Sequence, residues 1–262
     1  MMRRLRTARF WILVSVLLLA MVASSSSQTR ATADATPADA AARALNEGRY
    51  DEVDRLLRGA TDPRSTVLLA QALLERGRYA DAQALLAPRA ASAPGSDPAV
   101  EFGLLQIQLG QRDAGRRTLA RVLISSGQTT AADFVRLGRA ARALGQFQDA
   151  NGFFRRANQL APTDVTANVQ WGELFLEKYN KAEALKSFQA ALAADPGHIR
   201  AQLGLARVLA DENPPESRKA LAQVLKTNPG SVDAHLLTAE LAMDDRRRDD
   251  AQASVRKALA TN

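Results

Sequence analysis

The chain has 262 residues, of which 46% are hydrophobic but only 5% are aromatic, and its apolar residues are mainly Ala, Leu and Val. This composition favours closely packed helices over β-sheets, and the absence of cysteine excludes disulfides, thiol catalysis and cysteine-bound metals. The net charge of +7 does not indicate a nucleic-acid-binding surface, because four arginines precede the first apolar run and the other charges are interspersed with acids.

Residues 1–23 have the pattern of a secretory signal. Basic residues precede the apolar run 10–23, and small residues follow it. This run is short for a bilayer span, which needs about 20 residues. We therefore expect a cleaved signal peptide and an exported protein, periplasmic or extracellular. The alternative is an uncleaved inner-membrane anchor with the rest of the chain outside the cytoplasm. Residues 24–37 are rich in Ser, Thr and Ala and predict a flexible spacer.

Beyond the spacer the chain repeats with a period near 34 residues. Three prolines follow helical patterns and are 34 and 33 residues apart: Pro162, Pro196 and Pro229. Four glycines lie near the middle of their units, at spacings of 29, 33 and 35 residues: Gly48, Gly77, Gly110 and Gly145. Two helical patterns per unit at such a period indicate a helical solenoid.

The two clearest units share a motif. In residues 131–164 its members are Phe134, Leu137, Gly138, Ala141, Ala150, Phe154 and Pro162. In residues 165–198 they are Trp171, Gly172, Phe175, Ala184, Phe188 and Pro196. With this motif the chain resembles the tetratricopeptide repeat family from about residue 34 to residue 262. The resemblance implies an all-α, right-handed solenoid of about seven helix-turn-helix repeats, three weaker ones within 38–125 and four clear ones within 131–262.

The motif residues have structural reasons. Gly138 and Gly172 are small where the first helix of a hairpin crosses the second, whereas Phe154 and Phe188 fill the space between one hairpin and the next. The prolines end the second helices, because proline has no amide proton and disfavours helix in the residue before it. The stretch from residue 88 to 98 (PRAASAPGSDP) predicts a loop that would let the array bend.

A binding site is expected on the inner surface, which the resemblance implies is lined by the first helix of each hairpin. The candidate residues are those that the core does not use: Arg136, Arg139, Arg142, Gln170, Glu173, Arg200, Arg207 and Glu240. The first three share one helix face, and the five arginines together predict a concave basic strip. Arginine binds carboxylates through paired hydrogen bonds, so we expect a protein or peptide ligand with an acidic segment. The alternative is a set of ordinary solvated arginines, partly paired with Asp133, Glu173 and Glu177.

These patterns predict a non-catalytic protein–protein interaction scaffold in the bacterial cell envelope. The alternative is a membrane-tethered assembly subunit of a larger envelope or secretion complex, held by residues 10–23. We expect no catalytic site, metal or cofactor, because neither His198 nor His235 has a nucleophile pattern or a second ligand at metal spacing. We expect no nucleic-acid ligand, since no polar residue recurs at one position per unit. The last helical pattern has no capping helix after it, which indicates a tolerated short end or self-association there.

Overall fold

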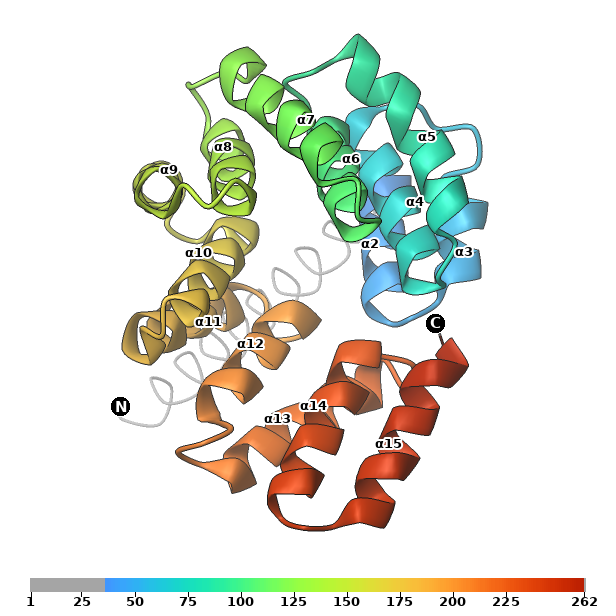
Figure 1. Cartoon of the computed structure of the whole chain (residues 1–262), viewed down its shortest axis with the longest axis vertical. Coiled ribbons are helices and arrows are strands. Elements are labelled where there is room, and N and C mark those ends of the chain that lie inside the picture. The colour runs from blue at the N-terminus through green and yellow to red at the C-terminus, as the bar shows by residue number, and fades with distance from the viewer. Residues whose placement is uncertain (1–35, 262) are drawn as a thin grey trace, which may run out of the picture.

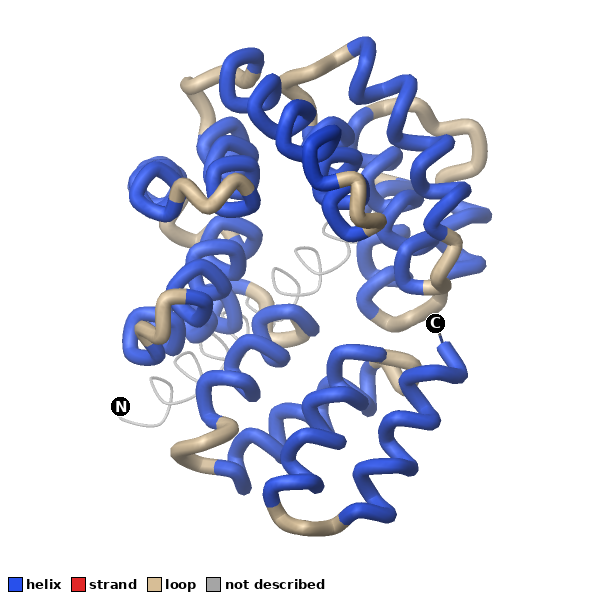
Figure 2. Tube along the Cα trace, viewed as in Figure 1, coloured by secondary structure: helices blue, strands red, loops and turns tan. Residues whose placement is uncertain are grey.

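The computed structural model describes residues 36–261, which form seven consecutive helical hairpins (Figures 1 and 2). Their helices are α2 (Pro37–Asn46), α3 (Tyr50–Leu56), α4 (Pro63–Glu75), α5 (Tyr79–Ser92), α6 (Asp97–Gln108), α7 (Arg112–Ser125), α8 (Ala131–Ala143), α9 (Phe147–Leu160), α10 (Val165–Glu177), α11 (Lys181–Ala194), α12 (Ile199–Leu209), α13 (Pro214–Thr227), α14 (Val232–Asp244) and α15 (Arg248–Thr261). Within this range there is no strand, so the prediction of an all-α solenoid is confirmed.

The predicted signal or anchor, residues 1–23, and nearly all of the predicted spacer lie outside the described residues. No helix within residues 36–261 has the length and apolar character needed to cross a bilayer. The export and anchoring predictions therefore stay predictions.

The turn inside six of the seven hairpins contains a left-handed residue, and in four of these it is glycine. Gly48, Gly77, Gly110 and Gly145 have φ angles of 72°, 68°, 79° and 79°. This conformation costs about 1 kcal/mol or more for residues with a Cβ atom. Tyr179 and Arg246 nevertheless adopt it, with φ of 56° and 61°, in the turns of the α10–α11 and α14–α15 hairpins. The four glycines therefore lie in the turns inside their hairpins, as the sequence predicts.

Glycines in the first helices make room for the large side chains between hairpins. A Cβ atom on Gly138 would lie 2.4 Å from the ring of Phe154, and one on Gly172 would lie 2.8 Å from the ring of Phe188. A third glycine, Gly204 in α12, also lies against Phe188, and a Cβ atom there would come within 2.3 Å of the ring. Both rings are fully buried. The small and large motif residues are therefore complementary halves of one contact.

The loop predicted for residues 88–98 is much shorter in the structure. α5 continues through Pro88 to Ser92, and α6 begins at Asp97, so only residues 93–96 connect the two helices. A proline inside a helix removes one backbone hydrogen bond. The helix persists because Leu86 and Ala90, on either side of Pro88, are buried in the core.

The first helices lie on the inside of the curvature. Each contacts the first helix of the next hairpin, from α2 with α4 through to α12 with α14, whereas second helices of neighbouring hairpins make no comparable contacts. This curvature brings the first hairpin beside the last ones (Figure 1). The Asn228 amide donates a hydrogen bond of 3.5 Å to the Tyr50 hydroxyl, and the same amide packs against Gly48. The described helices therefore curve into a ring, in which the first hairpin meets the α13–α14 turn at this contact.

Candidate protein-binding surface

Arg136 is held by two carboxylates. Its guanidinium donates two hydrogen bonds of 3.0 Å to the Asp97 carboxylate, at the start of α6, and one of 3.0 Å to Asp133. Asp133 also caps α8, since it accepts hydrogen bonds from the backbone amides of Thr129 and Thr130. Burial would raise the pKa of Asp133, but these hydrogen bonds outweigh it and hold the pKa well below its usual range. Arg136 is therefore a structural link between α6 and α8.

Arg139 forms the most buried ion pair of the inner surface. Its guanidinium lies 2.8 Å from Glu101 of α6, and the two side chains are only 15% and 7% exposed. Burial would lower the pKa of Arg139, but the nearby Glu101 carboxylate outweighs it, and the pKa rises. The Gln71 amide of α4 donates a further, long hydrogen bond of 3.4 Å to Glu101. This pair ties three successive first helices together.

Glu173 of α10 links the first helix before it, α8, to the first helix after it, α12. It lies 2.7 Å from Arg142 of α8 and 2.7 Å from Arg200 of α12. Burial would raise the pKa of Glu173, but Arg200 and Arg142 lower it below its usual value. Arg142 also donates hydrogen bonds to Gln170, at 3.3 Å, and to Glu177. The positive charge of Arg142 is thus matched by two carboxylates.

The structure therefore places the three arginines of α8 in ion pairs and not in an open basic strip. All three acids that the sequence suggested as partners, Asp133, Glu173 and Glu177, pair with these arginines. The sequence interpretation did not include Asp97 and Glu101, which lie 39 and 38 residues before their arginines. A signal was present, because these separations equal one repeat plus about one helical turn.

The more accessible charges of the inner surface lie on α12 and α14. Arg200 and Arg207 are about half-exposed, and Arg207 makes only a long ion pair of 3.7 Å with the exposed Asp233. Glu75, at the end of α4, lies close to this group across the ring. Burial raises the pKa of Glu75, Asp233 raises it further, and Arg200 opposes them. This part of the inner surface is therefore of mixed charge.

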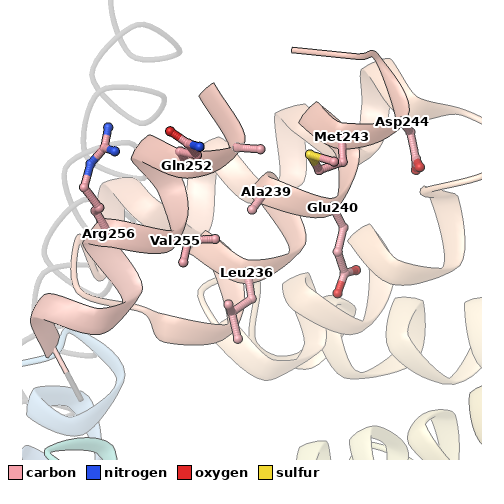
Figure 3. Close-up of a pocket in the computed structure, with 9 residues that line it drawn as sticks. Leu236, Ala239, Glu240, Met243, Asp244, Gln252, Val255 and Arg256 are labelled. Atoms are coloured by element: carbon pink, nitrogen blue, oxygen red, sulfur yellow. The ribbon is translucent and has the colours of Figure 1, made fainter. Parts of the chain in front are cut away.

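Glu240 is separate from this network. It lines a pocket of about 630 Å³ between α14 and α15 at the end of the array (Figure 3). The pocket is otherwise lined mainly by apolar side chains, including Leu236, Met243 and Val255.

The two histidines have local structural contacts. The His198 ring caps α12, where its Nδ1 accepts the amide proton of Ala201 at 3.3 Å. The Nε2 atom of His235 lies 2.8 Å from the carbonyl oxygen of Pro229, and the side chain is buried. Across residues 36–261 no cluster of three or more His, Cys, Asp and Glu side chains is arranged to hold a metal ion.

Comparison with known proteins agrees with this architecture. The tetratricopeptide repeat family model matches residues 169–213 and 209–262. A tetratricopeptide repeat protein from Parabacteroides merdae is similar in structure, with 13% identity, a TM-score of 0.57, and coverage of 81% of this chain and 85% of that one. A chain of the APC/C hetero-tetramer Cut9–Hcn1 has 16% identity and a TM-score of 0.54, and the match covers 86% of this chain and 46% of that one. Yeast Tom70 has 16% identity and a TM-score of 0.52, and the match covers 81% of this chain and 46% of Tom70.

At these identities the structural likeness concerns the fold alone. A search of curated proteins finds no match to this sequence. Residues 169–262 thus match the tetratricopeptide repeat family, and all seven hairpins share the fold of tetratricopeptide repeat proteins.

Proposed function

We propose that this protein is a non-catalytic scaffold of the bacterial cell envelope, which binds a partner protein or peptide on the inner surface of its ring. The observation that carries the proposal is the contrast between the two parts of that surface. The charges of α8 are buried in ion pairs, whereas those of α12 and α14 remain accessible. The proposed location rests on the signal-like pattern of residues 1–23.

The proposed ligand is an acidic segment, and Arg200 and Arg207 are its proposed anchors. Arg207 can exchange its long pair with Asp233 for a ligand carboxylate at little cost, because exposed ion pairs contribute about 0–1 kcal/mol. The arginines of α8 are poorer anchors because their side chains are at most 20% exposed, whereas that of Arg200 is 51% exposed. Arg200 also shares its partner Glu173 with Arg142, so Glu173 keeps one ion pair when Arg200 turns to a ligand.

An alternative is a membrane-tethered subunit that assembles a larger envelope complex. The apolar run 10–23 favours it if that run is retained. Cell fractionation with N-terminal sequencing separates the two proposals. A soluble product that starts near residue 24 supports the free scaffold, and an intact N-terminus in the membrane fraction supports the tether.

The experiment that tests the binding surface is affinity capture from envelope extracts of the source organism. Three baits are compared: the wild type, the inner-surface variant Arg200→Gln/Arg207→Gln, and the control Arg155→Gln/Arg156→Gln on the exposed face of α9. The expected result is a protein retained by the wild type and the control but lost from the inner-surface variant. Equal retention by all three baits would exclude Arg200 and Arg207 as anchors.

A further inference from the structure

The last hairpin exposes an apolar surface that every earlier clear hairpin buries. Counted from the starts of their helices, Val135, Val169, Leu203 and Leu236 are the fifth residues of α8, α10, α12 and α14. The first three are at most 7% exposed, but Leu236 is 42% exposed. The eighth residues of the second helices are Phe154, Phe188, Leu221 and Val255. The first three are at most 2% exposed, whereas Val255 is 38% exposed.

Two further apolar side chains are exposed on the same helices, Met243 of α14 and Leu259 of α15. Met243 lines the same pocket as Leu236 and Val255, and Leu259 lies one turn after Val255 on the same face of α15. We call Leu236, Met243, Val255 and Leu259 the end face. Figure 3 shows that its α14 residues and Val255 come from the two adjacent helices around the pocket of about 630 Å³.

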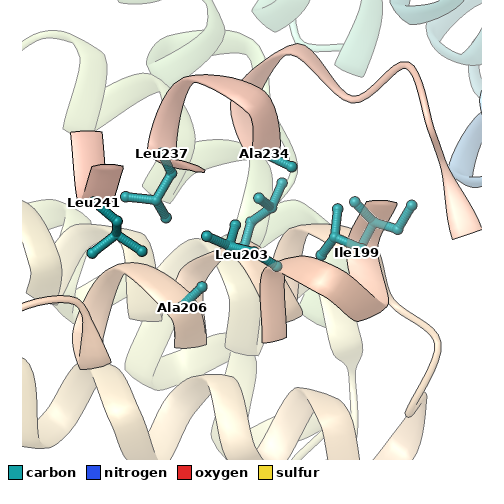
Figure 4. Packing of buried hydrophobic residues seen from close by; sticks show 8 residues of the cluster. Ile199, Leu203, Ala206, Ala234, Leu237 and Leu241 are labelled. Atoms are coloured by element: carbon teal, nitrogen blue, oxygen red, sulfur yellow. The ribbon is translucent and has the colours of Figure 1, made fainter. Parts of the chain in front are cut away.

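The preceding interface shows which element covers such a face. There Leu203, Leu221 and Val224 pack against Ala234, Leu237 and Leu241 of α14 (Figure 4). The covering helix thus presents a small residue, an apolar residue three positions later, and another seven positions later. Leu236 and Val255 of the end face occupy the positions that Leu203 and Leu221 have in that interface. Met243 and Leu259 occupy those of Ala210 and Leu225, which pack against the same cluster, so a helix with this spacing suits the end face.

Charge specifies the covering helix further. At two successive interfaces the ninth residue of one first helix pairs with the second residue of the next. Glu173 pairs with Arg200 at 2.7 Å, and Arg207 pairs with Asp233 at 3.7 Å. Glu240 is the ninth residue of α14, and no other side chain within residues 36–261 forms an ion pair with it. Its complement is a basic residue directly before the small one.

The start of a second copy does not fit this description. The first hairpin can be aligned with the last by their turn residues, Gly48 and Arg246. Thr36, which caps α2, and Asp39 and Arg43 within α2 then correspond to Ala234, Leu237 and Leu241 of α14. These three positions of the first hairpin are therefore polar. Head-to-tail stacking of copies would bury these polar groups, including the ion pair of Asp39 with Arg64, against the apolar end face, which is costly.

We propose that the end face binds an amphipathic helix of a partner protein, which takes the place of the next first helix. Such a helix carries a basic residue, a small residue directly after it, and apolar residues three and seven positions after the small one. This site is distinct from the inner surface of the ring and is independent of the function proposed for that surface.

The test uses two labelled peptides with the sequence of residues 231–246, which have the required small and apolar residues. One peptide keeps Asp233 and the other carries Asp233→Arg. Both are constrained as helices on the opposite face, because isolated helices of this length are marginal in water. Fluorescence anisotropy measures their affinity for the full-length protein. We expect the wild type to prefer the Asp233→Arg peptide about five-fold, and Glu240→Arg to reverse the preference, since one such pair contributes up to about 1 kcal/mol.

Variants of the end face complete the design. Met243→Lys/Leu259→Lys should weaken both peptides at least ten-fold, whereas Ile124→Lys, an exposed apolar residue of α7, should leave binding unchanged. Arg200→Gln/Arg207→Gln should also leave it unchanged. Absence of peptide binding, or a preference that does not follow residue 240, would overturn the proposal. Light scattering that shows a dimer lost in Met243→Lys/Leu259→Lys would overturn it in favour of a second copy packed back to back.

Discussion

Replacement of Arg139 by methionine should destabilise the ring because it leaves a buried carboxylate without its main partner. Arg139 and Glu101 are 2.8 Å apart and nearly buried. Removal of one member of a buried ion pair costs about 3–5 kcal/mol. Glu101 keeps the long hydrogen bond from Gln71 at 3.4 Å, and the pair retains some contact with solvent. We therefore expect Arg139→Met to lower the free energy of unfolding by about 2 kcal/mol.

Urea unfolding followed by circular dichroism at 222 nm measures this loss. The double variant Arg139→Met/Glu101→Met removes both charges and should lie within about 1 kcal/mol of the wild type, because apolar residues of similar volume often replace a buried pair without loss. Arg142→Met is the matched control. Its partner Glu173 keeps the ion pair with Arg200, so the loss should be about 1 kcal/mol or less.

A loss below about 0.5 kcal/mol for Arg139→Met, or a double variant no more stable than the single one, would refute the reasoning. Either result would mean that Glu101 is already solvated or satisfied by other groups. The same measurement bears on binding studies, because a variant that unfolds the ring cannot report on its inner surface. Arg200 and Arg207 are the better positions for such studies, since their charges are accessible.

Three further outcomes are expected. Burial lowers the pKa of His198 below its usual 6.5, so the unfolded chain takes up a proton more readily than the folded chain. The free energy of unfolding should therefore fall as the pH drops from about 7 to 5. His198→Asn keeps a side chain that can cap α12, and it should reduce this pH dependence in thermal melts. Gly48→Ala should lower the melting temperature more than Gly145→Ala, because both glycines have positive φ but only Gly48 packs against Asn228. Small-angle X-ray scattering should show a larger radius of gyration for Gly48→Ala and not for Gly145→Ala. Phe188→Ala should cost about 3–5 kcal/mol in urea unfolding, and a cost below about 1 kcal/mol would contradict its place in the core.

Local sequence was sufficient for the hairpins. The 34-residue period, the turn glycines and the prolines predict where helices begin, turn and end, because each signal acts within one or two helical turns. The motif residues predict the core for a similar reason, since Gly138 and Phe154 meet inside one hairpin. Where a local signal was misleading, at Pro88, burial of its neighbours outweighed the lost hydrogen bond and the helix continued.

The candidate site could be predicted only in part. The sequence indicated which side chains line the inner surface, because helical periodicity assigns them to one face. It did not determine their partners. Arg136 and Arg139 pair with acids 39 and 38 residues earlier, and Arg200 pairs with an acid 27 residues earlier. These separations depend on how far one first helix is displaced along the next, which is a property of the packed array.

By itself, then, the sequence determined the repeat, the helices and the core, because those depend on contacts within a hairpin or between neighbouring motif residues. Only the tertiary structure decided that the α8 arginines are paired, that the last hairpin exposes Leu236 and Val255, and that Asn228 meets Tyr50 across 178 residues. The physical reason is the superhelix. Its curvature is the sum of small rotations from one hairpin to the next, and no single unit encodes where that sum will bring the first and last hairpins.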